Sequence, residues 1–172
     1  DARIYVTGMS NGAMMAYKLA CEMGDVFAAF APVAGAMNLE ICAPEGRPSA
    51  IIFHAIDDKH VPFMGGQAEE GLRAALGKDP KPDSSVADAM QFWLQHTYCR
   101  QFPEKTIESD YEDTIYFCAE GRHVRLIALT GGGHTWPGSE KTWQGGDTPL
   151  PNVEATQMIW DFFNAHPPRE VF

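Results

Sequence analysis

A serine flanked by glycines stands near the start of the chain, at a point where a strand pattern passes into a helix pattern. Gly8-Met9-Ser10-Asn11-Gly12 fits the motif G-x-S-x-G. A tight strand–turn–helix strains the backbone at such a serine, and the flanking glycines let strand and helix approach without side-chain clashes. The hydroxyl of Ser10 would then project above the sheet, and the main-chain N–H of Asn11 could donate to an oxyanion. An ordinary Gly/Ser turn carries the same letters, so the motif needs support from other residues.

A base and an acid are the support that a nucleophilic serine requires. A hydroxyl reacts poorly without a base, and the base needs a carboxylate to hold its tautomer. Asp57 and Asp58 follow one apolar run, and His134 follows another apolar run and three glycines. Catalytic groups gather beyond the carboxyl ends of strands in open α/β sheets, and in this fold class the acid and the base follow the serine in this chain order. Spacing does not choose between Asp57 and Asp58, and either could merely cap the turn.

Short apolar runs predict the strands that would bring these groups together. They are rich in β-branched and aromatic residues and are bounded by Pro, Gly and Asp, which is typical of buried strands. The predicted strands are Arg3–Thr7, Phe27–Val33 and Ala50–Ala55, followed by a hairpin of Thr114–Cys118 and His123–Leu129 around a turn that contains Gly121.

Helical periodicity alternates with these strands. Residues Asn11–Met23 are apolar nearly all round and predict a buried helix. Gly66–Leu76 predicts a surface helix, and a helix follows Asp83, Ser84 or Ser85 as its cap, with Val86, Met90, Trp93, Leu94 and Thr97 on one face. The last helix is predicted at Asn152–Asn164, capped by Asn152, with Met158, Ile159, Phe162 and Phe163 inward. Strands alternating with helices predict an α/β fold: a mostly parallel sheet with helices on both faces.

Length and charge limit the classes of function. The chain of 172 residues predicts a single domain over residues 1–172, and 13 Lys and Arg against 23 Asp and Glu give a net charge of −10. This balance leaves no basic footprint for nucleic acid or an anionic membrane surface. No apolar run approaches the roughly 18 residues of a membrane span.

Four cysteines allow three pairings, of which Cys21–Cys42 with Cys99–Cys118 is the most local. Those disulfides would imply an oxidising, exported setting. Four reduced, buried thiols are the alternative.

The motifs taken together resemble one family. The segments TGMSNGAMMAYKLACE, FAAFAPVAGAM, FHAIDDKHVPF and GGGHTWPG, with IWDFF near the end, are similar to the polyhydroxybutyrate depolymerase/feruloyl esterase-type family of α/β-hydrolases. The resemblance implies Ser10 as nucleophile, Asp58 rather than Asp57 as triad acid, and His134 as base. It also implies that Trp136 lines the mouth of the site, that the protein is secreted, and that no cofactor or metal is needed.

The expected function is therefore a serine carboxylic-ester hydrolase, acting on polyester or on feruloyl or acetyl esters of plant polysaccharide. The resemblance also implies several strands and an oxyanion loop before the nucleophile, which this chain lacks. We expect it to be the C-terminal portion of a longer α/β-hydrolase domain, able to self-associate through the exposed edge at Arg3–Thr7. Ala55 replaces the family's usual Gly.

Two other interpretations use the same residues. One is a catalytically silent fragment that binds a polymer or partner through the aromatic loop around Trp136 and Trp143. The other is a metal site, which the resemblance makes unnecessary, built from His54, Asp57, Asp58 and His60. Outside the metal-site interpretation, His54 is interpreted as a structural residue. The remaining histidines other than His134 are interpreted as core or surface residues: His60, His96, His123 and His166.

Overall fold

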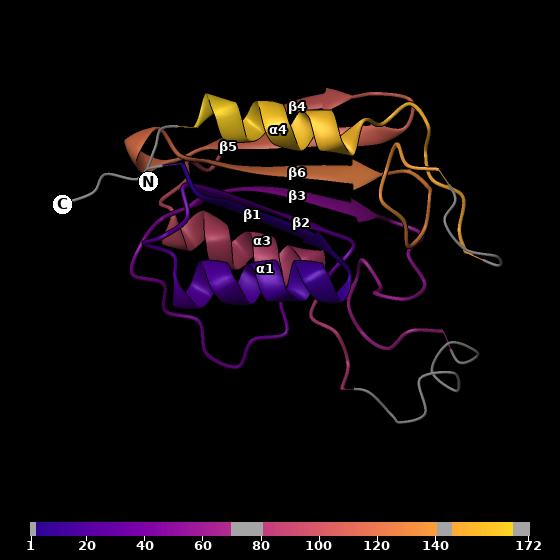
Figure 1. Cartoon of the computed structure of the whole chain (residues 1–172), viewed down its shortest axis with the longest axis horizontal. Helices are drawn as coiled ribbons and strands as arrows, with labels where there is room; N and C mark the ends of the chain where they lie inside the picture. Colours follow the sequence, from indigo (N-terminus) through magenta and orange to yellow (C-terminus); the bar gives the residue numbers. More distant parts are fainter. Residues whose placement is uncertain (1–2, 70–80, 141–145, 167–172) are drawn as a thin grey trace.

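A mixed sheet of six strands with helices on both faces makes up the computed structural model, which describes residues 3–69, 81–140 and 146–166 (Figure 1). The strands lie in the order β1-β2-β3-β6-β5-β4. The first four strands in this order pair in parallel. The strand β5 pairs antiparallel with both of its neighbours, β6 and β4. Their bounds are β1 (Tyr5–Met9), β2 (Ala29–Val33), β3 (Ser49–Ala55), β4 (Glu104–Ile107), β5 (Tyr111–Phe117) and β6 (His123–Leu129). The α/β class is confirmed.

Two hydrophobic clusters fill the space on either side of this sheet. Helices α1 (Asn11–Glu22) and α3 (Val86–His96) cover one face, and α4 (Ala155–Ala165) covers the other (Figure 1). Successive strand residues alternate between the two clusters. Phe30 and Ile52 pack with α1 and α3, whereas Ala31 and Phe53 pack with α4. A strand buried on both faces takes apolar residues at most positions, which is why β2 and most of β3 read as continuous apolar runs.

The first helix is less buried than its composition predicts. Ala13, Ala16, Tyr17, Ala20 and Cys21 are buried. Met15, on the opposite face, is 52% exposed, so the expectation of a fully buried helix is wrong. The sheet covers only one side of α1, so the apolar residues on its other side remain exposed.

The helix α3 begins as predicted. Ser85 is its cap: the Ser85 hydroxyl accepts from the N–H of Asp88, and the Asp88 carboxylate accepts from the N–H of Ser85. Val86, Met90 and Trp93 are buried on the predicted face.

The C-terminal helix begins three residues later than predicted. Its cap position is Glu154, without a side-chain hydrogen bond, and Asn152 instead donates to the carboxylate of Asp110. Ile159, Phe162 and Phe163 are buried as expected.

The antiparallel hairpin β5–β6 is confirmed, whereas β4 was not predicted. All four residues of β4 are exposed, so it carries no apolar alternation. No helix occupies the described part of the predicted Gly66–Leu76 helix, residues 66–69, and its remainder lies outside the described residues.

Both local disulfides are present, Cys21–Cys42 and Cys99–Cys118, and no cysteine is free. The first ties the end of α1 to the loop after β2. The second ties the segment after α3 to the end of β5, across an isolated bridge between the same two residues.

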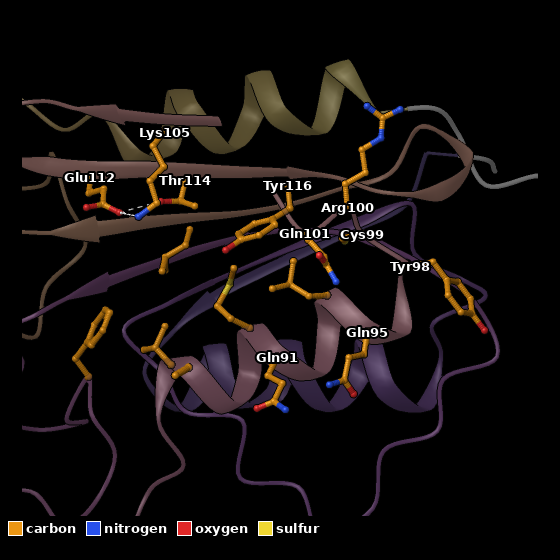
Figure 2. A pocket seen from close by; sticks show the side chains of 16 residues that line it. Gln91, Gln95, Tyr98, Cys99, Arg100, Gln101, Lys105, Glu112, Thr114 and Tyr116 are labelled. Atoms are coloured by element: carbon orange, nitrogen blue, oxygen red, sulfur yellow. Dashed lines mark hydrogen bonds and ion pairs between the residues drawn. The ribbon is translucent and has the colours of Figure 1, made fainter. Parts of the chain in front are cut away.

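Two hollows lie against the sheet. One, of about 760 Å³, runs between α3 and the strands β4, β5 and β6, with the Lys105–Glu112 pair at one end and Tyr98 at the other (Figure 2). The second, of about 660 Å³, lies between β1 and α4 and is lined by Tyr5, Trp136 and Trp160 among others. Neither is lined by the serine, aspartates or histidine that the sequence proposes for chemistry.

Among the residues that the structure describes, the helices lack the length and apolar character required to cross a bilayer.

Candidate active site

Ser10 occupies a sharp turn between β1 and α1. Its φ of 56° and ψ of −119° lie where residues other than glycine are strained. The turn is fixed from two sides: the Ser10 N–H donates to the carbonyl of Val33 at 2.9 Å, and the Ser10 carbonyl accepts from Ala13 and Met14. The first helical residue, Asn11, therefore follows directly on a serine that stands above the end of the sheet.

The two glycines of the motif are not equivalent. A Cβ on Gly8 would lie 2.6 Å from the carbonyl carbon of Gly12, closer than such atoms approach in real proteins. A Cβ on Gly12 would meet nothing within 4 Å. Close approach of strand and helix therefore requires glycine at position 8 only, which corrects the expectation that both are needed.

Asp58 lies buried in the turn after β3, with a side chain that is 0% exposed. One carboxylate oxygen, Oδ1, accepts from the main-chain N–H groups of His60 and Val61 at 2.8 and 2.9 Å. The other, Oδ2, lies 2.9 Å from Nδ1 of His134. The main-chain N–H groups of the turn thus hold one oxygen of Asp58, and the other oxygen faces His134.

His134 connects this carboxylate to the serine. Its Nε2 lies 2.9 Å from the hydroxyl oxygen of Ser10, and its side chain is 9% exposed. A carboxylate only accepts hydrogen bonds, so Nδ1 carries the proton and donates to Asp58, which leaves the lone pair of Nε2 facing the hydroxyl. The structure brings Ser10, Asp58 and His134 together, with His134 between the other two.

The ionised form of Asp58 is favoured despite its burial. Burial alone would raise the pKa of the carboxyl group. The hydrogen bond and charge interaction with His134, the N–H of Val61 and the charge interaction with His54 lower it by more, so the pKa lies below its usual value. The carboxylate is therefore charged at neutral pH and can hold the histidine tautomer.

Asp57 has a different partner from Asp58. Its Oδ1 accepts from the main-chain N–H of Gly133 at 3.1 Å, one residue before His134. It therefore contacts the backbone of the glycine loop, whereas Asp58 contacts the imidazole.

His54 supports the acid from behind. Its Nε2 donates to the carbonyl of Val61 at 2.8 Å and lies 3.6 Å from Oδ2 of Asp58. Burial lowers the pKa of His54, so the ring is neutral at pH 7, and its Nδ1 has no hydrogen-bond partner within the described ranges. The expectation of a structural role for His54 agrees with these contacts.

The metal-site interpretation would need a different set of residues from those proposed. Asp58, His60 and His134 are the group whose candidate ligand atoms lie within 4.8 Å of one another in the described part of the chain. Neither His54 nor Asp57 belongs to it. Two members of this group, Asp58 and His134, are hydrogen-bonded to each other through Oδ2 and Nδ1. The candidate metal ligands are therefore the same side chains that link to Ser10.

Trp136 follows His134 by two residues and is anchored on α4, where its indole N–H donates to the hydroxyl of Thr156 at 2.9 Å. It lines the hollow beside β1. Trp143, the other aromatic residue of the proposed loop, lies outside the described residues.

Two neighbours of His134 were not predicted from the sequence. The carboxylate of Asp147 accepts from the main-chain N–H of His134, and the ring of His60 stacks on its imidazole. Asp147 stands in a Gly- and Pro-rich segment without periodicity, and His60 resembles any surface histidine, so no sequence signal identified either residue.

Comparisons with known proteins lead to esterases. NocK of Nocardia uniformis subsp. tsuyamanensis, a protein assigned as an esterase, is 33% identical over 153 residues, which cover 78% of this chain and 42% of NocK. Feruloyl esterase B of Piromyces equi is 29% identical over 147 residues, covering 82% of this chain and 26% of that protein. No protein-family model matches the chain. The chain is thus similar in sequence to esterases, and it spans less than half of the length of either relative.

Proposed function

We propose that this chain carries the catalytic serine, acid and base of a carboxylic-ester hydrolase. The observation that carries the proposal is the pair of 2.9 Å contacts that link Ser10 to His134 and His134 to Asp58. Similarity to two esterases supports the reaction class. The strained turn at Ser10 supports its role as nucleophile, because strained backbone of this kind is typical of catalytic serines on strand-to-helix turns.

The first half-reaction transfers the acyl group to the serine. His134 Nε2 takes the hydroxyl proton as Ser10 Oγ attacks the ester carbonyl, which gives a tetrahedral oxyanion. When this intermediate collapses, the C–O bond to the alcohol breaks and His134 returns the proton to the departing oxygen. The alcohol leaves, and an acyl–Ser10 ester remains.

Water completes the cycle by the same route. His134 takes a proton from water as the water oxygen attacks the acyl carbon, and then returns it to Ser10 Oγ as the carboxylic acid departs. Asp58 keeps the proton on Nδ1 and stabilises the imidazolium in both halves. The N–H of Asn11, at the positive end of α1, is the donor that we assign to the oxyanion.

The finer identity of the protein is part of the same proposal. We assign the fold to the α/β-hydrolase type and its substrates to feruloyl or acetyl esters of plant polysaccharide or to a polyhydroxybutyrate-like polyester. Trp136 would contact the acyl group or the polymer. Two disulfides support an extracellular setting, since such bonds persist in oxidising compartments.

A fluorophosphonate probe tests the nucleophile directly, because it bonds to a serine whose hydroxyl a neighbouring base has activated. Intact-mass spectrometry of the 172-residue chain should find one adduct, and peptide mapping should place it on Ser10. Ser10→Ala should abolish both labelling and hydrolysis of short-chain p-nitrophenyl esters, by about 10⁴-fold or more. The matched control is Ser84→Ala, in the loop before α3. A folded Ser10→Ala variant with normal turnover would refute the mechanism.

Substrate class is tested once labelling is established. Release of ferulate, acetate or hydroxybutyrate from the corresponding polymers should single out one ester, and Trp136→Ala should raise KM for that ester more than for p-nitrophenyl acetate.

A second candidate is a binding fragment without turnover. The aromatic hollow between β1 and α4, which Trp136, Trp160 and Phe163 line, favours it. This alternative predicts retention of the polymer without labelling of Ser10, the opposite of the outcome expected for the hydrolase.

A further inference from the structure

A second carboxylate holds the main chain of the proposed base. Oδ2 of Asp147 accepts from the N–H of His134 at 2.8 Å. Asp58, by contrast, contacts the ring of the same residue. His134 is thereby fixed at both ends, its imidazole by one aspartate and its backbone by another.

The contact with Asp147 is close-fitting. Gly133, the residue before His134, has φ of +54°, and a Cβ there would lie 2.4 Å from Oδ2 of Asp147. Glycine is therefore required twice at this position, for its backbone conformation and to let the carboxylate approach. The glycine before the histidine is what allows Asp147 to reach the N–H of His134.

His60 completes the surroundings. Its ring stacks on that of His134 with centroids 4.7 Å apart and planes 22° apart. Its Nδ1 lies 4.0 Å from Oδ2 of Asp147. Asp147 thus contacts the backbone of His134 and lies beside the ring that covers its imidazole.

We propose that Asp147 is a positioning residue for His134, acting through the main-chain hydrogen bond. The inference rests on the proposed function. A general base must stay within hydrogen-bond reach of the proton that it takes, and a displacement of about 1 Å can cost about 100-fold in rate. His134 follows three glycines, and glycine backbone is freer than that of other residues, so the placement of His134 over Ser10 depends on contacts made by the loop itself. Asp57, on Gly133, and Asp147, on His134, supply two of those contacts.

The test compares three substitutions at this position. Asp147→Ala removes the acceptor, Asp147→Leu removes it while keeping a branched side chain of similar shape, and Asp147→Asn keeps a neutral oxygen that can accept from His134. The matched control is Asp161→Ala, which removes an exposed carboxylate of α4 that accepts from Gln157 one turn away. The readouts are the rate of fluorophosphonate labelling of Ser10, kcat and KM for p-nitrophenyl acetate, and the melting temperature.

Asp147→Ala and Asp147→Leu should lower the labelling rate and kcat by about tenfold, with KM within twofold of the parent chain. Asp147→Asn should recover most of the loss, and Asp161→Ala should leave all values unchanged. Parental labelling rates in both the Ala and the Leu variants would overturn the inference. A rise in KM with an unchanged kcat would also overturn it, because Asp147 would then be a substrate contact. If Asp147→Ala does not fold, the Leu and Asn pair decides alone. Absence of labelling in the parent chain would instead refute the proposed function, which separates the two failures.

Discussion

Replacing Asp58 by Asn should have a far larger effect than the same change at Asp57, although the two residues are adjacent and chemically identical. The structural reason lies in Oδ1 of Asp58, which already accepts from two main-chain N–H groups, those of His60 and Val61. An asparagine at position 58 would keep its oxygen on these two donors. Its amide NH2 would then take the place of Oδ2 and face Nδ1 of His134.

The consequence is the wrong tautomer of the histidine. An amide NH2 only donates, so Nδ1 of His134 must become the acceptor and the ring proton must move to Nε2. Nε2 would then present a proton, rather than a lone pair, to the hydroxyl of Ser10. Loss of the tautomer-holding carboxylate in a serine triad costs about 10⁴ in kcat, which corresponds to about 5 kcal/mol of transition-state stabilisation.

Asp57 offers no comparable penalty. Its Oδ1 accepts a single N–H, that of Gly133, and an asparagine oxygen can accept the same bond. We expect Asp57→Asn to stay within about threefold of the parent kcat, because Asp57 is exposed and the amide oxygen keeps the bond to Gly133, a bond whose net contribution is about 1 kcal/mol.

Both variants should be assayed with p-nitrophenyl acetate and by the rate of fluorophosphonate labelling, with circular dichroism to establish folding. A folded Asp58→Asn variant that retains a tenth of the parent rate would refute the tautomer argument. A greater loss in Asp57→Asn would exchange the roles of the two carboxylates.

Three further predictions concern stability. Gly8→Ala should destabilise the fold by roughly 1–3 kcal/mol or more because its Cβ meets the backbone of α1, whereas Gly12→Ala should be neutral or stabilising by up to about 1 kcal/mol; equal melting temperatures would contradict this. Burial is the main cause that lowers the pKa of His166 to about 4, so between pH 6.5 and 4 the unfolded chain binds a proton that the folded chain does not. The free energy of unfolding should therefore fall by up to about 3 kcal/mol as the pH drops from about 6.5 through 4. Thermal melts across that range should show a smaller fall in His166→Gln. The two disulfides have sequence separations of 21 and 19 residues, and reduction of each should cost about 3 kcal/mol; thiol titration in denaturant without reductant should find no free cysteine, and four reactive thiols would remove the argument for an oxidising compartment.

The parts of the fold that the sequence could predict are those governed by period and by strand ends. The apolar runs of β2 and β3 indicate strands that are buried on both faces. The capping residues Ser85 and Asp88 indicate where α3 begins. The edge strand β4 escaped prediction because it is exposed throughout and shows no alternation of apolar and polar residues. An edge strand is formed by its neighbour, and its own sequence carries little of the information.

The same distinction separates Asp57 from Asp58. Both follow β3, and chain order alone gives each a place beside His134. The turn decides between them, because only the residue that accepts the N–H groups of His60 and Val61 has its second oxygen directed at the imidazole. Turn geometry of this kind depends on backbone angles that residue types do not specify, and the resemblance to a family was needed to favour Asp58.

Contacts between loops lie furthest from what a sequence can predict, and His134 depends on them. Asp147 stands 13 residues after His134 in the chain and accepts from its main-chain N–H. No periodicity relates the two residues, and a Gly- and Pro-rich segment is compatible with many paths. His134 and the glycine before it are nevertheless contacted by three carboxylates, to which we assign separate tasks: Asp58 would set the tautomer of the ring, while Asp57 and Asp147 would fix the loop that carries it. A loop of three glycines can present an oriented base only if its backbone is held, and the hydrogen bonds from the N–H groups of Gly133 and His134 to Asp57 and Asp147 are the contacts that we propose for this task.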